Sequence, residues 1–142
     1  MDFEVKRQKI LEVFSQHSLA VIATADKHGK PESALVGFNH LHSLEIIFGT
    51  FLTFRKYKNL LSNPQVAFVI GWDHQVTVQV EGAVYELSGT ELTEMQEKYL
   101  EKYPKAHKYL HHSEERLFKV SPSWLRYTNL SSQPEEIFEI KF

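Results

Sequence analysis

Three cations crowd the first turn and a half of an expected helix. Arg55, Lys56 and Lys58 follow an apolar run over residues 44–48 that is typical of a strand, and we expect Thr53 to be the N-cap. Cations at the positive end of a helix dipole cost a few tenths of a kcal/mol each. Free N–H groups, a hydroxyl and three cations would together suit a bound phosphate. The alternative is a solvated basic helix, and the charges alone leave it open.

Histidines are the second group of candidate functional residues. His40 and His42 are spaced so that both imidazoles could contact a metal or haem, but no third ligand is visible, which favours a polar turn. His107 and His111 have i, i+4 spacing without the acidic residue of the His-Glu-x-x-His pattern, which favours solvated surface. Asp73-His74 resembles part of a catalytic dyad, but no serine is placed to complete it.

The composition describes an ordinary soluble chain. Its 142 residues suit a single domain, 1–142, with one core. A formal net charge of −2 provides no basic field for nucleic acid, and no apolar run is long enough to span a membrane. The chain has no cysteine, which excludes a disulfide framework, thiolate metal sites and cysteine nucleophiles. We expect a cytoplasmic protein, since the first residues also lack the apolar centre of a signal peptide.

Hydrophobic periodicity predicts seven or eight short strands and two or three helices. Short connections between the strands favour antiparallel pairing, and so many short strands favour a barrel or sandwich. We expect a bulge at Glu81-Gly82-Ala83 and a break at Ser121-Pro122. The helices are expected at 3–16, with Phe3, Ile10 and Phe14 on one face, from Thr53 to about 62, and from Ser88 to 103, with Met95, Tyr99 and Tyr103 packed on the barrel. The strands are expected at 19–25, which we expect to be buried on both faces, and at 33–38, 44–48, 66–72, 75–87, 115–120, 123–128 and 137–142.

The order of these elements resembles a known family. The matching residues are Ala20-Val21-Ile22-Ala23-Thr24, the turn Gly29-Lys30-Pro31, then Thr50…Arg55-Lys56…Asn59-Leu60…Asn63-Pro64-Gln65-Val66, and Val78-Gln79-Val80-Glu81-Gly82. The sequence resembles the pyridoxamine-5′-phosphate-oxidase-like FMN-binding split barrels. The resemblance implies a mainly β fold, an antiparallel Greek-key split β-barrel with flanking helices, and FMN as cofactor.

The resemblance also implies a set of site residues. In that family the Arg-Lys pair at this helix start holds the FMN phosphate, the second strand runs along the ring and ribityl chain, largely through its backbone, and the partner of a homodimer completes the site. The implied residues here are Thr53, Arg55 and Lys56 at the phosphate, Leu35, Val36, Gly37 and Phe38 on the second strand, Gly49, Thr50 and Thr77 near the ring, and Trp124 and Arg126 from the partner. An apolar slot for the ring could come from Phe38, Phe48, Trp72 or Trp124.

Three positions depart from the vitamin-B6 oxidases of that family. Ala34 and Asn39 stand where those enzymes carry Arg and Lys, and Phe54 stands where they carry Ser. Their C-terminal substrate motif is absent as well. Oxidation of pyridoxamine phosphate is therefore not expected, and Arg55 and Lys56 would carry more of the phosphate binding.

The function expected from the sequence is FMN binding by a homodimer, as a flavin-dependent oxidoreductase with an unknown small substrate. A flavin brings its own reactive atoms, so the absence of a catalytic triad, thiol or metal motif is consistent with this function. The alternatives are a non-catalytic flavin-binding or stress-related protein, and a split barrel that binds deazaflavin or haem.

Overall fold

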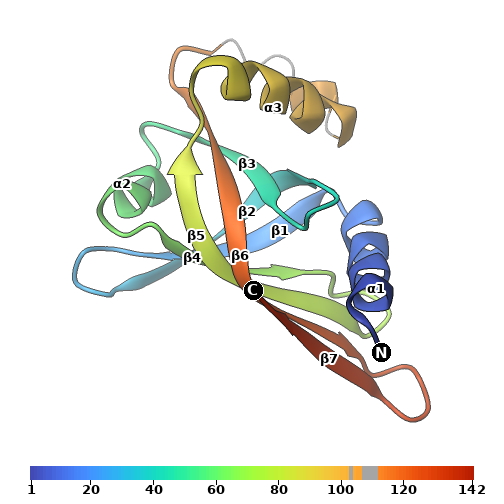
Figure 1. The fold of residues 1–142 in the computed structure, drawn as a ribbon. Helices are drawn as coiled ribbons and strands as arrows, with labels where there is room; N and C mark the ends of the chain where they lie inside the picture. Colours follow the sequence, from blue (N-terminus) through green and yellow to red (C-terminus); the bar gives the residue numbers. More distant parts are fainter. Residues whose placement is uncertain (103, 107–111) are drawn as a thin grey trace.

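The computed structural model describes residues 1–102, 104–106 and 112–142. In these residues seven antiparallel strands form one sheet in the order β3-β2-β1-β4-β5-β6-β7, and a further pairing of β3 with β6 closes the first six into a barrel (Figure 1). The mainly β split-barrel fold expected from the sequence is confirmed. The elements are α1 Phe3–Ser15, β1 Leu19–Ala25, β2 Pro31–His40, β3 Ile46–Phe51, α2 Arg55–Ser62, β4 Gln65–Ile70, β5 Val76–Glu86, α3 Gly89–Lys102, η1 Pro104–Ala106, β6 Glu115–Asn129 and β7 Glu136–Lys141.

β6 is one long strand, so the predicted break at Ser121-Pro122 is wrong. Proline lacks the N–H that a ladder needs, but the register of the β5–β6 pair shifts between Glu81 and Gly82, opposite this site. The bulge predicted there is confirmed, and it lets the strand continue. A Cβ on Gly82 would lie 2.9 Å from the Cα of Pro122, so only glycine fits this close approach.

In the described residues, three α-helices flank the barrel (Figure 1). α1 buries Ile10, Val13 and Phe14, whereas Phe3, which we expected on the same face, is 41% exposed. Asp2 caps this helix by accepting a hydrogen bond from the N–H of Val5 at 3.0 Å. None of the helices in the described residues has the length and apolar character needed to cross a bilayer.

α3 covers an outer patch of the barrel with a small apolar cluster of its own. Tyr99 is buried there against Ile47, Leu87 and Leu117, with Met95 packed beside it. The expected packing of the Met95–Tyr99 stripe on the barrel is therefore confirmed, and Tyr103, the last residue of that stripe, lies outside the described residues.

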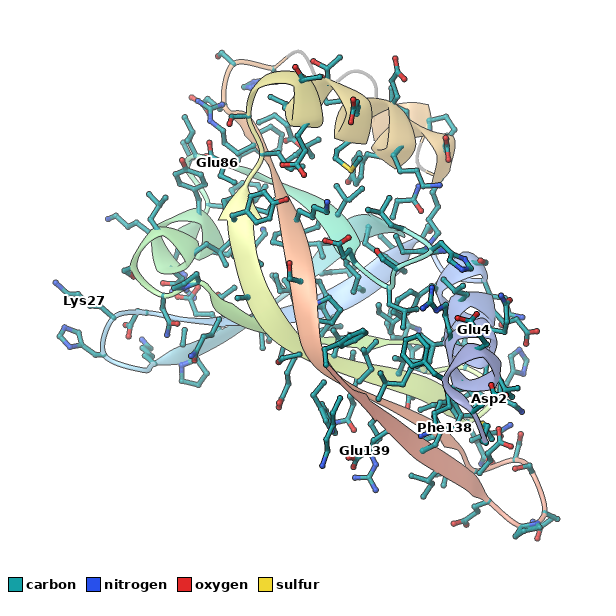
Figure 2. The ribbon with its side chains drawn as sticks, in the orientation of Figure 1. Asp2, Glu4, Lys27, Glu86, Phe138 and Glu139 are labelled. Carbon is teal, nitrogen blue, oxygen red and sulfur yellow. The ribbon has the colours of Figure 1, made fainter. Side chains whose placement is uncertain are left out.

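β7 extends the sheet beyond the barrel and passes under α1. Phe138 of β7 is labelled in Figure 2 close to Asp2, at the N-terminal end of α1. Lys6 of α1 donates to the carbonyl of Glu139 at 2.9 Å and lies 5.9 Å from the centroid of the Phe138 ring. β7 thus pairs with the outer end of β6 and also contacts α1.

β1 differs from its expected burial. We predicted a strand buried on both faces, but Ala20, Ile22 and Thr24 are buried while Val21 and Ala23, which alternate with them, are only half-buried. The reason is that one face of β1 points into the barrel and the other lies on the outside of the sheet. No helix in the described residues covers that outer face by an extensive contact with β1, where the main helix contact comes from α2 at the strand end.

Candidate functional site

A cleft of about 330 Å³ lies between the start of α2 and the ends of β1 and β2. β2 pairs with β3 only over Phe38–His40, so its first half has no neighbour on that side and the cleft opens beside it. We call this the α2 cleft. Its lining residues are Ile22, Thr24, Glu32, Ser33, Ala34, Thr53, Phe54, Arg55 and Lys56.

The structure brings together the residues assigned to phosphate binding. Thr53, Arg55 and Lys56 all line the α2 cleft, whereas Lys58 is exposed and does not line it. The expectation that Thr53 caps the helix is wrong, because α2 begins at Arg55 and the N-cap position belongs to Phe54. Among the described residues no side chain caps the helix, so the N–H groups of its first turn have no side-chain acceptor there.

Lys56 is the buried cation of the cleft. The residue is 9% exposed, and its Nζ lies 4.6 Å from the centroid of the Phe54 ring. Burial lowers the pKa of Lys56 from its ordinary value of 10.5, and the carboxylate of Glu115 acts in the opposite direction. In the part of the chain that the structure describes, Lys56 forms no ion pair. Because burying an unpaired charge is costly, the arrangement favours an added anion.

Arg55 lies at the open side of the cleft. Its side chain is 77% exposed, and its Nε pairs with Oε1 of Glu32 at 3.0 Å. The other oxygen of Glu32 accepts a hydrogen bond from Asn59 at 3.1 Å, and Asn59 also donates to Thr24. An ion pair with so exposed a partner contributes at most about 1 kcal/mol, so an arriving anion can compete with Glu32 for Arg55.

Gly49 and Thr50 lie in the second half of β3 and are not part of the lining of this cleft. A Cβ on Gly49 would collide with Oε1 of Glu115 and lie 3.1 Å from Leu117. Burial raises the pKa of the Glu115 carboxyl to about 7, while the ammonium of Lys56 acts to lower it. The hydroxyl of Thr50 is buried without a hydrogen-bond partner among the described residues.

The four residues assigned on β2 alternate in orientation. Val36 and Phe38 point into the core at 5% and 0% exposure, while Leu35 is 59% exposed and Gly37 half-buried. Only the backbone of Val36 and Phe38 can therefore contact a ligand outside the barrel. Phe48 is also fully buried, so neither Phe38 nor Phe48 offers its ring to a surface site.

Thr77, Trp124 and Arg126 lie on the outer face of the sheet, away from the α2 cleft of their own chain. Thr77 lies opposite Thr128 on β6, and Arg126 lies opposite Glu139 on β7. The indole of Trp124 donates to Glu139 at 3.0 Å. The Nε of Arg126 is buried and has no hydrogen-bond partner among the described residues. Trp72 lies apart from them, 48% exposed, with its ring 6.0 Å from that of His17.

The histidines do not form a site in the described residues, where no group of three His, Asp or Glu side chains could hold a metal. Burial, followed by the charges of Lys102 and Lys98, lowers the pKa of His40 to about 4, so its imidazole is neutral at pH 7. His42 is exposed, and His107 and His111 lie outside the described residues.

Sequence reasoning missed three residues of this region. Glu32 on β2 and Glu115, the first residue of β6, act on the two cations, and Asn59 in the middle of α2 donates a hydrogen bond to Glu32. Asn59 was noted only as part of a motif. No local pattern marks Glu32 or Glu115, because they reach α2 through strand pairing.

Comparison with known proteins gives consistent results. A family model described as pyridoxamine 5′-phosphate oxidase matches residues 7–129. The pyridoxine/pyridoxamine 5′-phosphate oxidase of Cronobacter sakazakii is 32% identical over 87 residues, which make up 60% of this chain and 38% of that protein. The chain thus spans well under half the length of this curated relative.

Two solved structures show the same fold at low sequence identity. A heme binding protein from Mycobacterium smegmatis superposes with a TM-score of 0.81 at 15% identity, covering 95% of this chain and 57% of that one. A protein from Clostridium acetobutylicum related to general stress protein 26, of the pyridoxinephosphate oxidase family, superposes with a TM-score of 0.75 at 14% identity, covering 100% and 97%. At such identities the likeness shows the fold alone.

Proposed function

The chain belongs to the pyridoxamine 5′-phosphate oxidase family, and from this premise we propose that it binds FMN through the phosphate group, at the α2 cleft. The observation that carries the proposal is Lys56, a lysine that is 9% exposed as a residue, lines the cleft and has no ion pair in the described residues. The uncapped first turn of α2 adds N–H donors, and Arg55 adds a second cation. This donor set fits a phosphate.

The residues of the cleft divide the work of binding. Lys56 supplies a buried charge whose attraction to an anion is screened little by solvent. Arg55 supplies a planar guanidinium, which can leave its ion pair with Glu32 and pair with the phosphate instead. When bound, FMN supplies the electron-accepting ring, and the protein binds and orients it.

We propose that a second copy of this chain completes the site. A volume of about 330 Å³ lies at the low end of pockets that enclose a small molecule, roughly 300–1,000 Å³. The outer face of the sheet carries the exposed Leu35, the half-buried Val21 and Val69, and the unpartnered Nε of Arg126. We call it the outer sheet face. A second copy seated there would cover these apolar groups and place Trp124 and Arg126 near the partner's flavin.

The proposed activity is a flavin-dependent oxidation or reduction of a small substrate other than pyridoxamine phosphate. Ala34 lines the cleft but provides no charge, and the amide of Asn39 donates to the carbonyl of Lys98 on α3. Neither position can take the role of the Arg and Lys of the vitamin-B6 oxidases. We place the protein in the cytoplasm, in keeping with its lack of cysteine.

The test is FMN binding by matched variants of α2. Arg55→Ala with Lys56→Ala should abolish measurable binding, because each lost charge-assisted contact costs ~1.5–3 kcal/mol, or about one to two decades in Kd. Lys58→Ala removes a cation from the same helix outside the cleft and should bind FMN as the parent does. Fluorescence titration measures both, with circular dichroism to check folding. Parent-like binding by the double variant would disprove the phosphate assignment.

Haem is the competing ligand, since a solved structure of this fold is described as a heme binding protein. Absorption spectra of the purified protein with added FMN or hemin separate the two, because each cofactor has its own bands. Reduction of bound FMN by NADH or NADPH then distinguishes an oxidoreductase from a non-catalytic flavin carrier. Binding of hemin without binding of FMN would contradict the proposal and identify haem as the ligand.

A further inference from the structure

Glu32 is an anionic side chain of the protein inside the proposed phosphate site. It lines the α2 cleft together with Arg55 and Lys56. Its Oε1 lies 3.0 Å from the Nε of Arg55, and its Oε2 accepts a hydrogen bond from the amide of Asn59 at 3.1 Å. The side chain is 18% exposed. Both carboxylate oxygens therefore contact α2, and one of them pairs with the cation at the open side of the cleft.

Three elements hold this carboxylate in place. Glu32 lies on β2, directly opposite Thr24 of β1. Asn59 of α2 is 6% exposed, and its amide donates to Oε2 of Glu32 and to Oγ1 of Thr24, at 3.1 Å in both cases. The hydrogen bond from Asn59 does not depend on the ion pair with Arg55. If a ligand takes Arg55, Asn59 still holds the carboxylate beside the cleft, so Asn59 is a positioning residue for Glu32.

A phosphate that enters the cleft meets this carboxylate in two ways. The Nε–H of Arg55 is directed at Glu32, so the phosphate either takes this donor from the carboxylate or uses the other N–H groups of the guanidinium beside it. In both cases two negative groups lie close together and repel each other. Each effect lowers the affinity for a phosphate, and neither applies to a ligand without one.

Resting on the proposed function, we infer that Glu32 sets the preference of the site for phosphorylated over unphosphorylated flavin, because its carboxylate competes with the phosphate for Arg55. Glu32 weakens the binding of FMN and leaves the binding of riboflavin unchanged. An ion pair with a partner as exposed as Arg55 corresponds to about fivefold in Kd at most, and repulsion adds to this effect. The site therefore releases FMN more readily than its two cations alone would.

The experiment compares the parent protein with Glu32→Gln in fluorescence titrations with FMN and with riboflavin. The glutamine amide oxygen can still accept from Asn59, but the ion pair with Arg55 is lost. The Kd for FMN should fall about fivefold while the Kd for riboflavin stays constant. Glu94→Gln makes the same charge change at an exposed position on α3, outside the cleft lining, and should bind both flavins as the parent does. Tighter binding is a result that a merely structural role of Glu32 would not produce.

A second pair of variants tests whether the effect passes through Arg55. In a protein that carries Arg55→Ala there is no guanidinium to compete for, so adding Glu32→Gln should tighten FMN binding less than it does in the parent. An equal gain in both backgrounds would show that the carboxylate acts by repulsion alone, which overturns the competition for Arg55.

The remaining outcomes separate the inference from the proposed function. An unchanged or weaker affinity of Glu32→Gln for FMN overturns the role of Glu32 while FMN binding by the parent stands. An equal gain for riboflavin would show that Glu32 acts on the ring or ribityl chain and not on the phosphate, which also overturns it. If neither the parent nor Glu32→Gln binds FMN, the proposed function itself fails.

Discussion

At the scale of single residues, the site depends on where a few charges are buried. Lys56 and Arg55 are adjacent in sequence but differ greatly in exposure, because α2 turns Lys56 toward the barrel and Arg55 toward solvent. Lys56 is 9% exposed as a residue, whereas the side chain of Arg55 is 77% exposed. The buried one is expected to contribute more to phosphate affinity, since solvent screens its charge less. Single variants of the two residues would therefore differ, with the larger loss in Lys56→Ala.

Gly49 lies where the neighbouring side chains of Glu115 and Leu117 leave no room for a Cβ atom. Gly49→Ala should destabilise the protein by ~1–3 kcal/mol, because the new methyl group meets Glu115 and Leu117. Urea unfolding measures the loss.

Combining this change with Glu115→Ala removes one of the two obstructions, so the double variant should lose less than the sum of the single losses, by about 0.5 kcal/mol or more. Strictly additive losses would show that Glu115 does not occupy the space over Gly49.

At the scale of elements, the packing of α3 on the rest of the chain is opposed by the charge of a half-buried lysine. Lys102, the last residue of α3, donates to the carbonyl of Phe14 on α1 and lies 3.8 Å from the centroid of the Phe38 ring and 3.3 Å from Nδ1 of His40. Burial, followed by the charge of Lys98, lowers the pKa of Lys102 to about 7. No carboxylate pairs with it among the described residues, so its charge opposes the packing of α3.

The stability should therefore rise with pH in a defined window. Below pH 7 Lys102 is charged in both the folded and unfolded states, and the full penalty of its buried charge applies. Between pH 7 and its ordinary pKa of 10.5 the unfolded chain binds more protons than the folded one, so the free energy of unfolding increases as pH rises.

Lys102→Met should remove this increase and should stabilise the protein at pH 6–7. Lys98→Met, which changes a half-buried lysine paired with Glu101 on the same helix, removes only the smaller of the two causes and should reduce the increase while leaving most of it in place. Urea unfolding at pH 7 and pH 9 gives the comparison. A parent protein whose stability is flat across this window would contradict the burial argument.

At the scale of the whole molecule, the prediction concerns the outer sheet face. Leu35→Glu places a charge where the side chain is 59% exposed in the single chain, so the fold should tolerate it while the proposed dimer should not. Light scattering with size exclusion should show a dimer for the parent and a monomer for the variant. The FMN affinity of the variant should be lower, because the dimer is lost. Leu61→Glu, at a site 64% exposed on α2, is the matched control and should remain dimeric. A monomeric parent would refute the proposed assembly.

The fold could be predicted from the sequence to a large extent. Alternation such as Val76, Val78 and Val80, the turn at Gly29 and the bulge at Gly82 are local signals, and each arises from backbone geometry that a short stretch determines. The break predicted at Pro122 was wrong because proline's missing N–H was weighed alone, while the partner strand already shifts register at that point.

The candidate site, like the fold, could be predicted from the sequence only in part. The sequence by itself determined that cations gather at the start of α2, because helix periodicity and charge can be read over ten residues. Only the tertiary structure decided which cation is buried, that Glu32 and Glu115 face this pair, and that Trp124 and Arg126 lie outside the lining of the α2 cleft. Those relations depend on strand pairings between distant segments, such as Gly49 with Leu117, and on burial, which no local pattern specifies.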